Sequence, residues 1–379
     1  MKTNDFYFEF PEDLIAQEPL PVRSASKLLV LHKETGQIDH RKFTDLPDYL
    51  EPGDCLVMND TKVIPARLNG VTVQDTFSNF RAVRAAGGKR PWQRDEANSA
   101  CEFLLLKNVE GNLWECLVRP GKKLKPGSLA VFGTEGLLSA EVKEILDDGV
   151  RLVKFYPQGS FDEVLKKIGE VPLPPYIHQK LNEPDRYQTV YAKEAGSAAA
   201  PTAGLHFTEN MISQLKDKGI KIADVTLHVG LATFRPVKEE NVEDHEMHKE
   251  WYRITKEAAE TINAVKKAGK KVVCVGTTSC RTIETVAGQA SGAQVSGAAA
   301  SRNASPLLMP AEGDTKLFIY PGYQFKITDA LVTNFHLPGS TLLMLVSAMA
   351  GREKIMKAYE DAVRNRYRFF SFGDAMLIL

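Results

Sequence analysis

The chain has 379 residues, which is enough to bury a large core and favours two domains over one. Lysine plus arginine and aspartate plus glutamate number 48 each, so the net charge is zero and any affinity for nucleic acid must come from local basic patches. Five cysteines without a C-x-x-C pair predict reduced thiols in the cytoplasm and argue against structural zinc. Neither a signal peptide nor a membrane-spanning segment is expected, because the N-terminus is acidic and the longest apolar run, 342–350, is short.

The opening of the chain is expected to be rich in strands. Phe6, Phe8 and Phe10 alternate with other residues as in a strand, and 27–32 with 37–41 predicts a hairpin around Glu-Thr-Gly. Between residues 66 and 155 only short strand patterns occur, at 102–106, 113–118, 137–144 and 150–156. We therefore predict a small β-barrel domain at 66–155, inserted near the N-terminus of a main α/β domain made of 1–65 and 156–379.

The pattern after residue 160 changes to helices that alternate with strands. Helices are predicted at 161–168, 209–218 with Thr208 as N-cap, 255–269 with Thr255 as N-cap, 340–350 and 352–364, and strands at 220–229, 271–275, 317–320 and 329–335. The segments 76–100 and 287–313 are polar or rich in Ala, Ser and Gly, and are predicted to be flexible surface additions. Ligands of α/β sheets bind beyond the carboxyl ends of strands, which is where His228 would lie, and His206 precedes the 209–218 helix.

One candidate anion site follows the 271–275 strand. Gly276, Thr277, Thr278 and Ser279 offer main-chain N–H groups and hydroxyls at a helix start, with Arg281 in its first turn. The alternative is an ordinary capped helix with a surface arginine. The glycine fingerprints of dinucleotide-binding folds and of P-loops are both absent from the sequence.

The histidines supply candidates for acid–base chemistry. Asp244, His245 and His248 occur in Asp-His-Glu-Met-His, which suits a proton-transfer pair, a metal site or a solvated loop. His206 and His228 are each either structural or functional, and their expected loop positions favour function as much as structure.

Two basic segments are candidates for RNA contact. Arg119, Lys122, Lys123 and Lys125 surround two Pro-Gly turns, and arginines at 364, 366 and 368 interleave with aromatic residues. The alternatives are a solvated turn for the first segment and core packing of Phe369 and Phe370 for the second.

Nine blocks in order resemble the queuosine-biosynthesis family of S-adenosylmethionine:tRNA ribosyltransferase-isomerases over essentially the whole chain. The blocks are LPPYI (173–177), YQTVYA (187–192), AAPTAGLHFT (199–208), VTLHVG (225–230), DHEMH (244–248), VGTTS (275–279), IYPGY (319–323), TNFHLPGSTLLMLVSA (333–348) and YRFFSFGDAML (367–377). The chain departs from the family pattern at Ala232, where glycine is usual, at Cys280, where valine is usual, and in longer connections before Glu102 and Phe318.

The resemblance implies that the ribosyl part of S-adenosylmethionine is transferred to 7-aminomethyl-7-deazaguanine in the tRNA anticodon and isomerised. Epoxyqueuosine-tRNA forms, and adenine and methionine leave. S-adenosylmethionine is then a consumed co-substrate, no true cofactor or metal is expected, and tRNA is the macromolecular partner of a monomeric enzyme. The rival hypotheses are a metal-dependent hydrolase and a noncatalytic tRNA-binding module.

The implied reaction assigns tasks to the candidate residues. A base must remove a proton beside the sulfonium, an anion site must hold the methionine carboxylate, and an acid must help adenine leave. Asp244, His245 and His248 are the first catalytic candidates, and His206 and His228 the second. Thr277, Thr278, Ser279 and Arg281 are the candidates for the carboxylate, and Phe207 or Phe234 either stacks on adenine or packs in the core. The remaining substrate-binding candidates are Pro201, Thr202, Gly204, Gly230 and Arg235.

Overall fold

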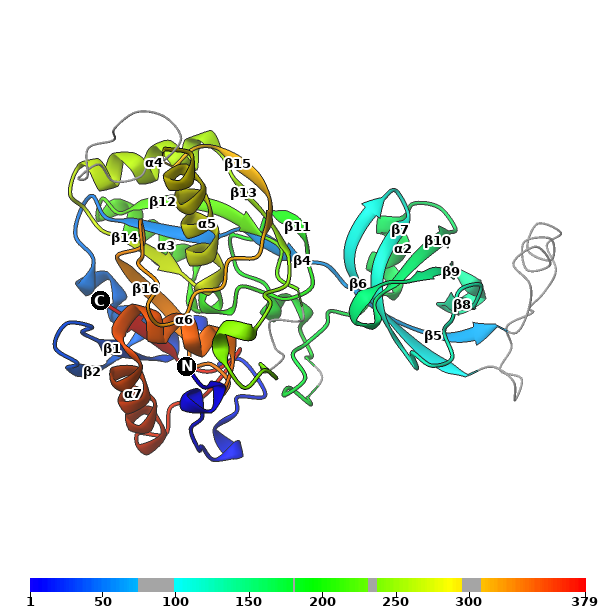
Figure 1. The fold of residues 1–379 in the computed structure, drawn as a ribbon, viewed down its shortest axis with the longest axis horizontal. Coiled ribbons are helices and arrows are strands. Elements are labelled where there is room, and N and C mark those ends of the chain that lie inside the picture. The colour runs from blue at the N-terminus through cyan, green and yellow to red at the C-terminus, as the bar shows by residue number, and fades with distance from the viewer. Residues whose placement is uncertain (74–98, 180, 231–236, 295–307) are drawn as a thin grey trace. The chain divides into compact units, whose positions relative to one another are not determined.

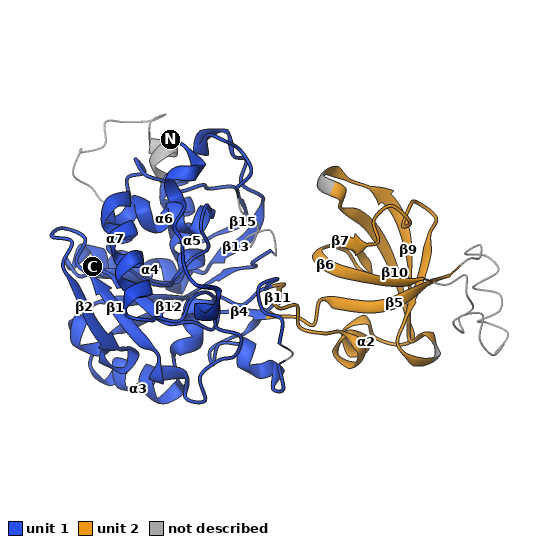
Figure 2. Ribbon diagram, turned by 90° about the horizontal axis from the view of Figure 1, so that it is seen from below, with its two compact units in different colours: residues 1–62, 174–195, 199–379 blue, residues 63–173, 196–198 orange. Residues whose placement is uncertain are grey.

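The protein is described by a computed structural model that covers all residues except 74–98, 180, 231–236 and 295–307 (Figure 1). The chain divides into two compact units (Figure 2). The first unit comprises residues 1–62, 174–195 and 199–379, and the second comprises 63–173 and 196–198. Each unit is considered by itself below.

The first unit is built on a mixed sheet whose described strands run in the order β15-β13-β12-β3-β14-β16-β17-β1-β2. Their bounds are β15 Ala311–Thr315, β13 Glu250–Ile254, β12 Lys221–Leu227, β3 Cys55–Asn59, β14 Val272–Val275, β16 Ala330–Asn334, β17 Ala375–Ile378, β1 Lys27–Leu31 and β2 Ile38–Lys42. The four central strands β12, β3, β14 and β16 are parallel. Strands β17 and β1 are parallel to each other but antiparallel to β16.

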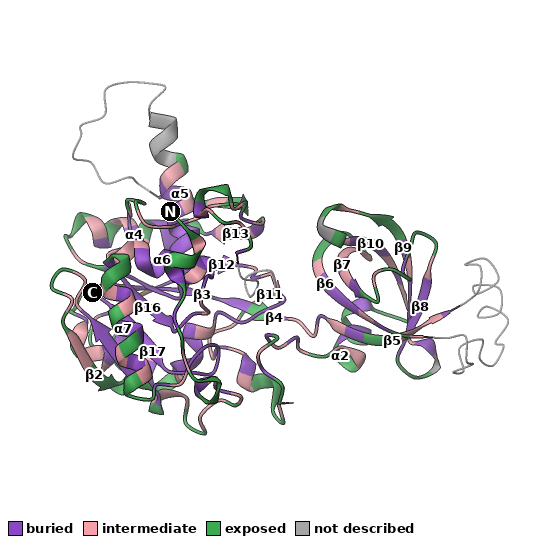
Figure 3. Cartoon of the chain, turned by 60° about the horizontal axis from the view of Figure 1, so that its bottom comes forward, coloured by how far each residue is buried: buried purple, intermediate pink, exposed green. Residues whose placement is uncertain are grey.

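Helices cover both faces of this sheet because its strands are apolar on both sides. Val57, Cys274 and Leu331 share one core with the helices α4 (Lys256–Lys267), α5 (Thr277–Gln294), α6 (Thr341–Ala350) and α7 (Arg352–Arg364). Met58 and Val275 face the opposite core, which includes α3 (Glu209–Asp217) and the 3-10 helix Phe43–Tyr49. Figure 3 shows the buried strands between these layers. The hydroxyls of Thr208, Thr255 and Ser340 cap α3, α4 and α6, as side chains of this kind do at helix starts.

The second unit is a closed barrel with the strand order β10-β7-β6-β5-β8-β9. The bounds are β5 Arg67–Val73, β6 Ala100–Glu110, β7 Leu113–Arg119, β8 Leu129–Phe132, β9 Leu138–Ile145 and β10 Arg151–Pro157. The helix α2 (Phe161–Ile168) belongs to this unit, because Phe161 stacks on Trp114 with ring centroids 5.6 Å apart. The predicted α/β domain with an inserted barrel is confirmed, while the barrel unit extends beyond the predicted 66–155 to include α2.

Several predicted elements differ from the structure. Phe6 ends a 3-10 turn, Thr3–Phe6, and the alternation with Phe8 reflects packing of their rings into the core rather than a strand. Residues 317–320 form no strand, and β15 lies earlier, beginning within the predicted surface segment 287–313 and ending at Thr315. Ala311–Thr315 is a strand because it pairs antiparallel with β13. The first residues of 287–313 continue α5, and most of 76–100 lies outside the described residues.

A short two-stranded sheet, β4 (Thr61–Val63) with β11 (Glu194–Ser197), completes the strand pairing of the described chain. Within the ranges that the structure describes, no helix is long and apolar enough to cross a membrane.

Candidate functional site

The sheet topology brings the segments next to several strands together at one end of the sheet. We call this end the edge, meaning the side where the strands terminate and not an outermost strand. The central strands are parallel, so the segments after β12, β3, β14 and β16 leave the sheet at the same edge. Because β17 and β1 run the opposite way, the segments before them reach that same edge. Residues that are far apart in sequence therefore meet there, which is where α/β proteins bind their ligands.

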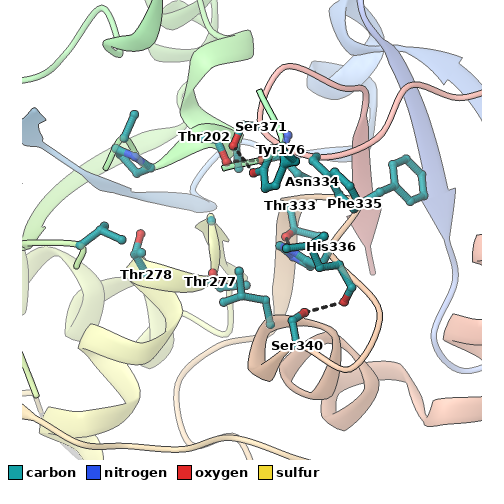
Figure 4. Close-up of a pocket in the computed structure, with 18 residues that line it drawn as sticks. Tyr176, Thr202, Thr277, Thr278, Thr333, Asn334, Phe335, His336, Ser340 and Ser371 are labelled. Atoms are coloured by element: carbon teal, nitrogen blue, oxygen red, sulfur yellow. Dashed lines mark hydrogen bonds between the residues drawn. The ribbon is translucent and has the colours of Figure 1, made fainter. Parts of the chain in front are cut away.

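A pocket lies at this edge, and we call it the edge pocket (Figure 4). Its empty volume is about 610 Å³, open solvent included. The lining combines hydroxyl, amide and imidazole groups with aromatic and aliphatic side chains; it includes Tyr176, Pro201, Thr202, Thr277, Thr278, Thr333, Asn334, Phe335, His336, Leu337, Ser340, Phe370 and Ser371. Apolar surface with a few convergent polar groups is typical of small-molecule sites.

One wall of the edge pocket is the start of α5. Gly276 has φ of +87°, a conformation that favours glycine, and it turns the chain from β14 directly into the helix. Thr277 and Thr278 then line the pocket, and the Asn59 side-chain amide donates to the Thr278 hydroxyl at 3.1 Å. The Ser279 hydroxyl instead donates back to the carbonyls of Val275 and Gly276, so this side chain serves the helix start rather than the pocket.

Arg281 lies outside the pocket lining, in a buried ion pair. Its Nη1 donates to the Glu250 carboxylate, and its Nε donates to the Leu317 carbonyl at 3.1 Å. The other Glu250 oxygen accepts the main-chain N–H of Gly230 at 3.0 Å. The positive charge that was predicted to hold a carboxylate is thus balanced inside the protein, and the surface position considered for Arg281 is wrong.

His206 is buried beside the edge pocket in a chain of hydrogen bonds. The Thr202 hydroxyl donates to Asn334 Oδ1 at 2.8 Å, so the amide group of Asn334 faces His206 Nε2 at 3.3 Å. His206 Nδ1 lies 2.9 Å from the Ser26 hydroxyl. Burial, with the charge of Arg368, lowers the pKa of His206 to about 4, so the ring is neutral near pH 7. Both ring nitrogens are engaged, which favours a structural role.

His228 follows β12 at the same edge of the sheet. Its Nδ1 lies 2.8 Å from the Thr61 hydroxyl, and its ring stacks on Trp251 with centroids 4.9 Å apart. Burial lowers the pKa of His228 to about 4. A neutral imidazole held by one nitrogen is able to accept a proton at the other, so His228 stays a candidate base.

In the 244–248 segment, Asp244 ends a short 3-10 turn, Val242–Asp244, and the following residues are irregular rather than helical. His245 Nδ1 lies 2.8 Å from the Glu239 carboxylate, and the ring packs edge-on against Phe318 at 5.3 Å. His248 stands perpendicular to His245 with ring centroids 6.5 Å apart. Asp244 is exposed and accepts from the Asn241 amide at 2.8 Å. The structure thus brings the two histidines together, outside the lining of the edge pocket.

The remaining predicted substrate residues fall into three groups. Pro201 and Thr202 line the edge pocket. Gly204 packs so closely on Tyr191 that a Cβ there would lie 1.9 Å from the phenol oxygen. Phe207 is buried with its ring centroid 5.0 Å from that of Phe43, so it packs in the core, which was the alternative to stacking on adenine. Phe234 and Arg235 lie outside the described residues.

Sequence reasoning missed the wall that follows β16. His336 is buried with Nε2 2.7 Å from the Thr333 hydroxyl, and burial lowers its pKa to about 3. Tyr176, which also lines the edge pocket, is hydrogen-bonded to the Ser371 hydroxyl at 2.6 Å. The available signal was the block 333–348, which the resemblance had already singled out.

The basic turn belongs to the barrel unit and is exposed at Arg119, Lys122, Lys123 and Lys125. Arg151 is buried beneath it and donates to the carbonyls of Gly121 and Leu124, each at 3.0 Å. A buried guanidinium that binds main-chain carbonyls fixes the shape of the turn while the lysines remain in solvent.

The described residues contain no group of three His, Cys, Asp or Glu side chains placed to hold a metal ion. All five cysteines are unpaired and buried. Burial raises the pKa of Cys55 and Cys101 to about 12, so neither thiol is a nucleophile near neutral pH.

Comparison with known proteins gives one consistent result. The family described as queuosine biosynthesis protein matches residues 3–378. The chain is 54% identical to the S-adenosylmethionine:tRNA ribosyltransferase-isomerase of Acetivibrio thermocellus and 51% identical to that of Clostridioides difficile, and each alignment covers 100% of both chains. It is also similar to a crystal structure of S-adenosylmethionine tRNA ribosyltransferase from Thermotoga maritima, with 39% identity, a TM-score of 0.52, and coverage of 99% of this chain and 100% of that one.

Proposed function

Because the chain belongs to the queuosine biosynthesis protein family, we propose that it is an S-adenosylmethionine:tRNA ribosyltransferase-isomerase. It transfers the ribosyl part of S-adenosylmethionine to 7-aminomethyl-7-deazaguanine in tRNA and isomerises it. The products are epoxyqueuosine-tRNA, adenine and methionine. The full-length identity of more than half with relatives that bear this name supports this function over a metal-dependent hydrolase or a noncatalytic tRNA-binding module.

The observation that carries the proposal is the edge pocket. It joins aromatic and aliphatic surface from Tyr176, Phe335 and Phe370 to a rim of hydroxyls, as a nucleoside with a ribose and a planar base requires. S-adenosylmethionine is bound there as a consumed co-substrate, and the enzyme needs no other cofactor. The helix start at Thr277 and Thr278 favours negative groups and repels the sulfonium, which therefore lies away from it.

Proton transfer is assigned first to His245, which lies outside the edge-pocket lining, so the reacting part of S-adenosylmethionine has to extend beyond that pocket. Glu239 is hydrogen-bonded to Nδ1, which orients the ring and favours a proton on that nitrogen. Nε2 is buried and has no hydrogen-bond partner, so it is the nitrogen left to accept a proton. His228 is the second candidate, because its depressed pKa keeps the ring neutral. His248 and Asp244 complete the block as neighbours of His245.

The basic turn of the barrel supplies the proposed tRNA contact. Arg119, Lys122, Lys123 and Lys125 are exposed cations within seven residues of one another, and such clusters bind phosphates without reading sequence. We further propose a monomer that acts in the cytoplasm, which suits a tRNA substrate and five unpaired cysteines.

Adenine release is the direct test. The protein is incubated with S-adenosylmethionine and tRNA that carries 7-aminomethyl-7-deazaguanine, and adenine is measured by chromatography. Release that depends on both substrates is expected, and its absence with folded protein would refute the function. His245→Ala is expected to fold and to lose most of the turnover. His32→Ala is the matched control, because His32 contacts Asp39 at the opposite edge of the sheet; equal rates in the two variants would move the base elsewhere.

A further inference from the structure

A second pocket lies at the same edge of the sheet, before β17 and β1. Arg23, Ser26, Arg186 and His206 line it together with residues 371–373, and its empty volume is about 300 Å³. We call it the arginine pocket. It shares Ser371 with the edge pocket, and His206 in its lining is hydrogen-bonded to Asn334 of the edge pocket. The two pockets are therefore neighbours within the first unit.

Arg23 and Arg186 line the arginine pocket, Arg368 lies near its His206, and all three donate to main-chain carbonyls rather than to carboxylates. Arg23 donates to the carbonyls of Leu205 and Asp185 at 3.2 and 3.1 Å, and Arg186 donates to the carbonyl of Leu20. Arg368, whose charge acts on His206, donates to the carbonyl of Glu18. Among the residues that the structure describes, none of these three guanidinium groups forms an ion pair.

Asp185 acts on the charge of Arg23 and Asp374 on that of Arg368, but neither carboxylate forms an ion pair with them, and that of Asp374 is hydrogen-bonded elsewhere. The two oxygens of Asp374 accept the main-chain N–H groups of Lys27 and Arg368 at 2.9 and 2.8 Å. Arg186 Nε and Arg368 Nη1 are buried and have no hydrogen-bond acceptor in the described chain. Burial and then the charge of Arg186 lower the pKa of Arg23, as expected where like charges are close. Arg186 in the pocket lining and Arg368 beside it thus hold buried N–H donors without an acceptor in the described chain.

We propose that the arginine pocket binds an oxyanion of a substrate, either the methionyl carboxylate of S-adenosylmethionine or a backbone phosphate of tRNA. The inference rests on the proposed function and refines it. Arginine forks match the two oxygens of a carboxylate or a phosphate, and the two arginines that line this cavity are able to bind such a group together. Arg281 is not assigned this role, because Glu250 balances its charge, although its Nη2 has no hydrogen-bond partner in the described chain.

The carboxylate reaches this site from the neighbouring edge pocket. The edge pocket offers surface for the nucleoside, and the neighbouring arginine pocket takes a negative end of the same molecule. His206 lines the arginine pocket and is hydrogen-bonded to Asn334 of the edge pocket, and its lowered pKa keeps the ring neutral, so it adds no charge to the cations beside it. A phosphate would reach the pocket from solvent instead.

The test compares Arg186→Gln with the unmodified protein. Dissociation constants are measured for S-adenosylmethionine, for decarboxylated S-adenosylmethionine and for tRNA at several salt concentrations. Arg352→Gln is the matched control, since Arg352 is an exposed arginine that also donates to a main-chain carbonyl, that of Asp5. Arg186→Lys keeps the charge without the fork and is the second variant if the glutamine variant does not fold.

A carboxylate contact predicts that Arg186→Gln weakens S-adenosylmethionine binding roughly 10- to 100-fold and leaves the decarboxylated analogue unaffected. A purely structural effect would weaken both compounds equally and would overturn the proposal. A phosphate contact predicts weaker tRNA binding, with the salt slope reduced by about one unit, and unchanged S-adenosylmethionine binding. Unchanged constants for all three probes in the folded variant would also overturn it.

Inorganic sulfate separates this inference from the proposed function. Sulfate is expected to stabilise the unmodified protein against heat at lower concentrations than it stabilises Arg186→Gln, and identical titrations would refute the oxyanion site. Adenine release by the unmodified protein decides the function independently. A protein without adenine release but with the sulfate difference would retain the site and lose the function.

Discussion

The buried pair of Arg281 and Glu250 allows a quantitative test of how the site is supported. The two side chains are only 4% and 1% exposed, and they form a direct ion pair. Removing one partner of such a pair leaves a charge in the interior and costs about 3–5 kcal/mol. Glu250→Gln and Arg281→Met are therefore each expected to lower the free energy of unfolding by that amount, which is a large part of the total for an ordinary domain.

The double variant Glu250→Leu/Arg281→Met is expected to behave differently. With both side chains replaced by apolar groups, no unpaired charge is left in the interior, and such replacements are usually neutral or stabilising. The amide N–H of Gly230 loses an acceptor, which costs about 1 kcal/mol. The double variant is thus expected to be more stable than either single variant.

Urea unfolding at pH 7, followed by circular dichroism, measures these differences. A loss below about 1 kcal/mol in Glu250→Gln, or a double variant as unstable as the single ones, would refute the reasoning. The double variant also tests the carboxylate role of Arg281 without a collapsed site. Unchanged S-adenosylmethionine binding by this variant would show that Arg281 acts only within the fold.

Three further predictions address the site and its surroundings. Burial lowers the pKa of His206 from 6.5 to about 4, so the unfolded chain binds the proton more readily than the folded chain. The free energy of unfolding therefore falls as the pH drops from about 6.5 to 4, by up to roughly 3 kcal/mol. His206→Gln should flatten this pH dependence in a series of urea unfolding measurements. Gly204→Ala should lower the free energy of unfolding by about 1–3 kcal/mol, because the added Cβ meets the hydroxyl of Tyr191. Adding Tyr191→Phe to Gly204→Ala should recover part of the loss in thermal unfolding, and equal stability of Gly204→Ala and the double variant would contradict the contact. Lys122→Ala and Lys125→Ala should each reduce the salt slope of tRNA binding by about one unit without changing S-adenosylmethionine affinity, and unchanged slopes would remove the basic turn from the RNA interface.

The elements that the sequence predicted well are those with local signals. Thr208 and Thr255 precede helices and do cap them, and β14 is a short β-branched strand that leads directly into a helix. Strand β15 could not be predicted, because Ala311–Thr315 has little strand propensity and becomes a strand only by pairing with β13. The strand predicted near the N-terminus was wrong for the opposite reason. Phe6 and Phe8 have the alternation of a strand, but they alternate because both rings pack into the core.

The candidate site was predicted in part, for a related reason. The start of α5 was found because a strand followed by Gly-Thr-Thr is a local pattern. Its opposite wall, from Thr333 to Ser340, comes from β16, and no local pattern says that β16 lies beside β14. Arg23 and Arg186 were missed because their partners are main-chain carbonyls of distant segments, which leave no mark in the sequence around them.

The order of strands explains why one edge carries both pockets. If β17 had continued the parallel direction of β16, the segment before it would have emerged at the opposite edge, and Ser371 would lie far from Asn334. The antiparallel step between β16 and β17, followed by the parallel pair of β17 with β1, brings Ser371 and Ser26 to the carboxyl ends of the central strands. His206 then contacts Ser26 on one side and Asn334 on the other. A reversal of strand direction thus places a cluster of arginines beside a pocket built on parallel strands, and it joins the proposed nucleoside site to the proposed anion site.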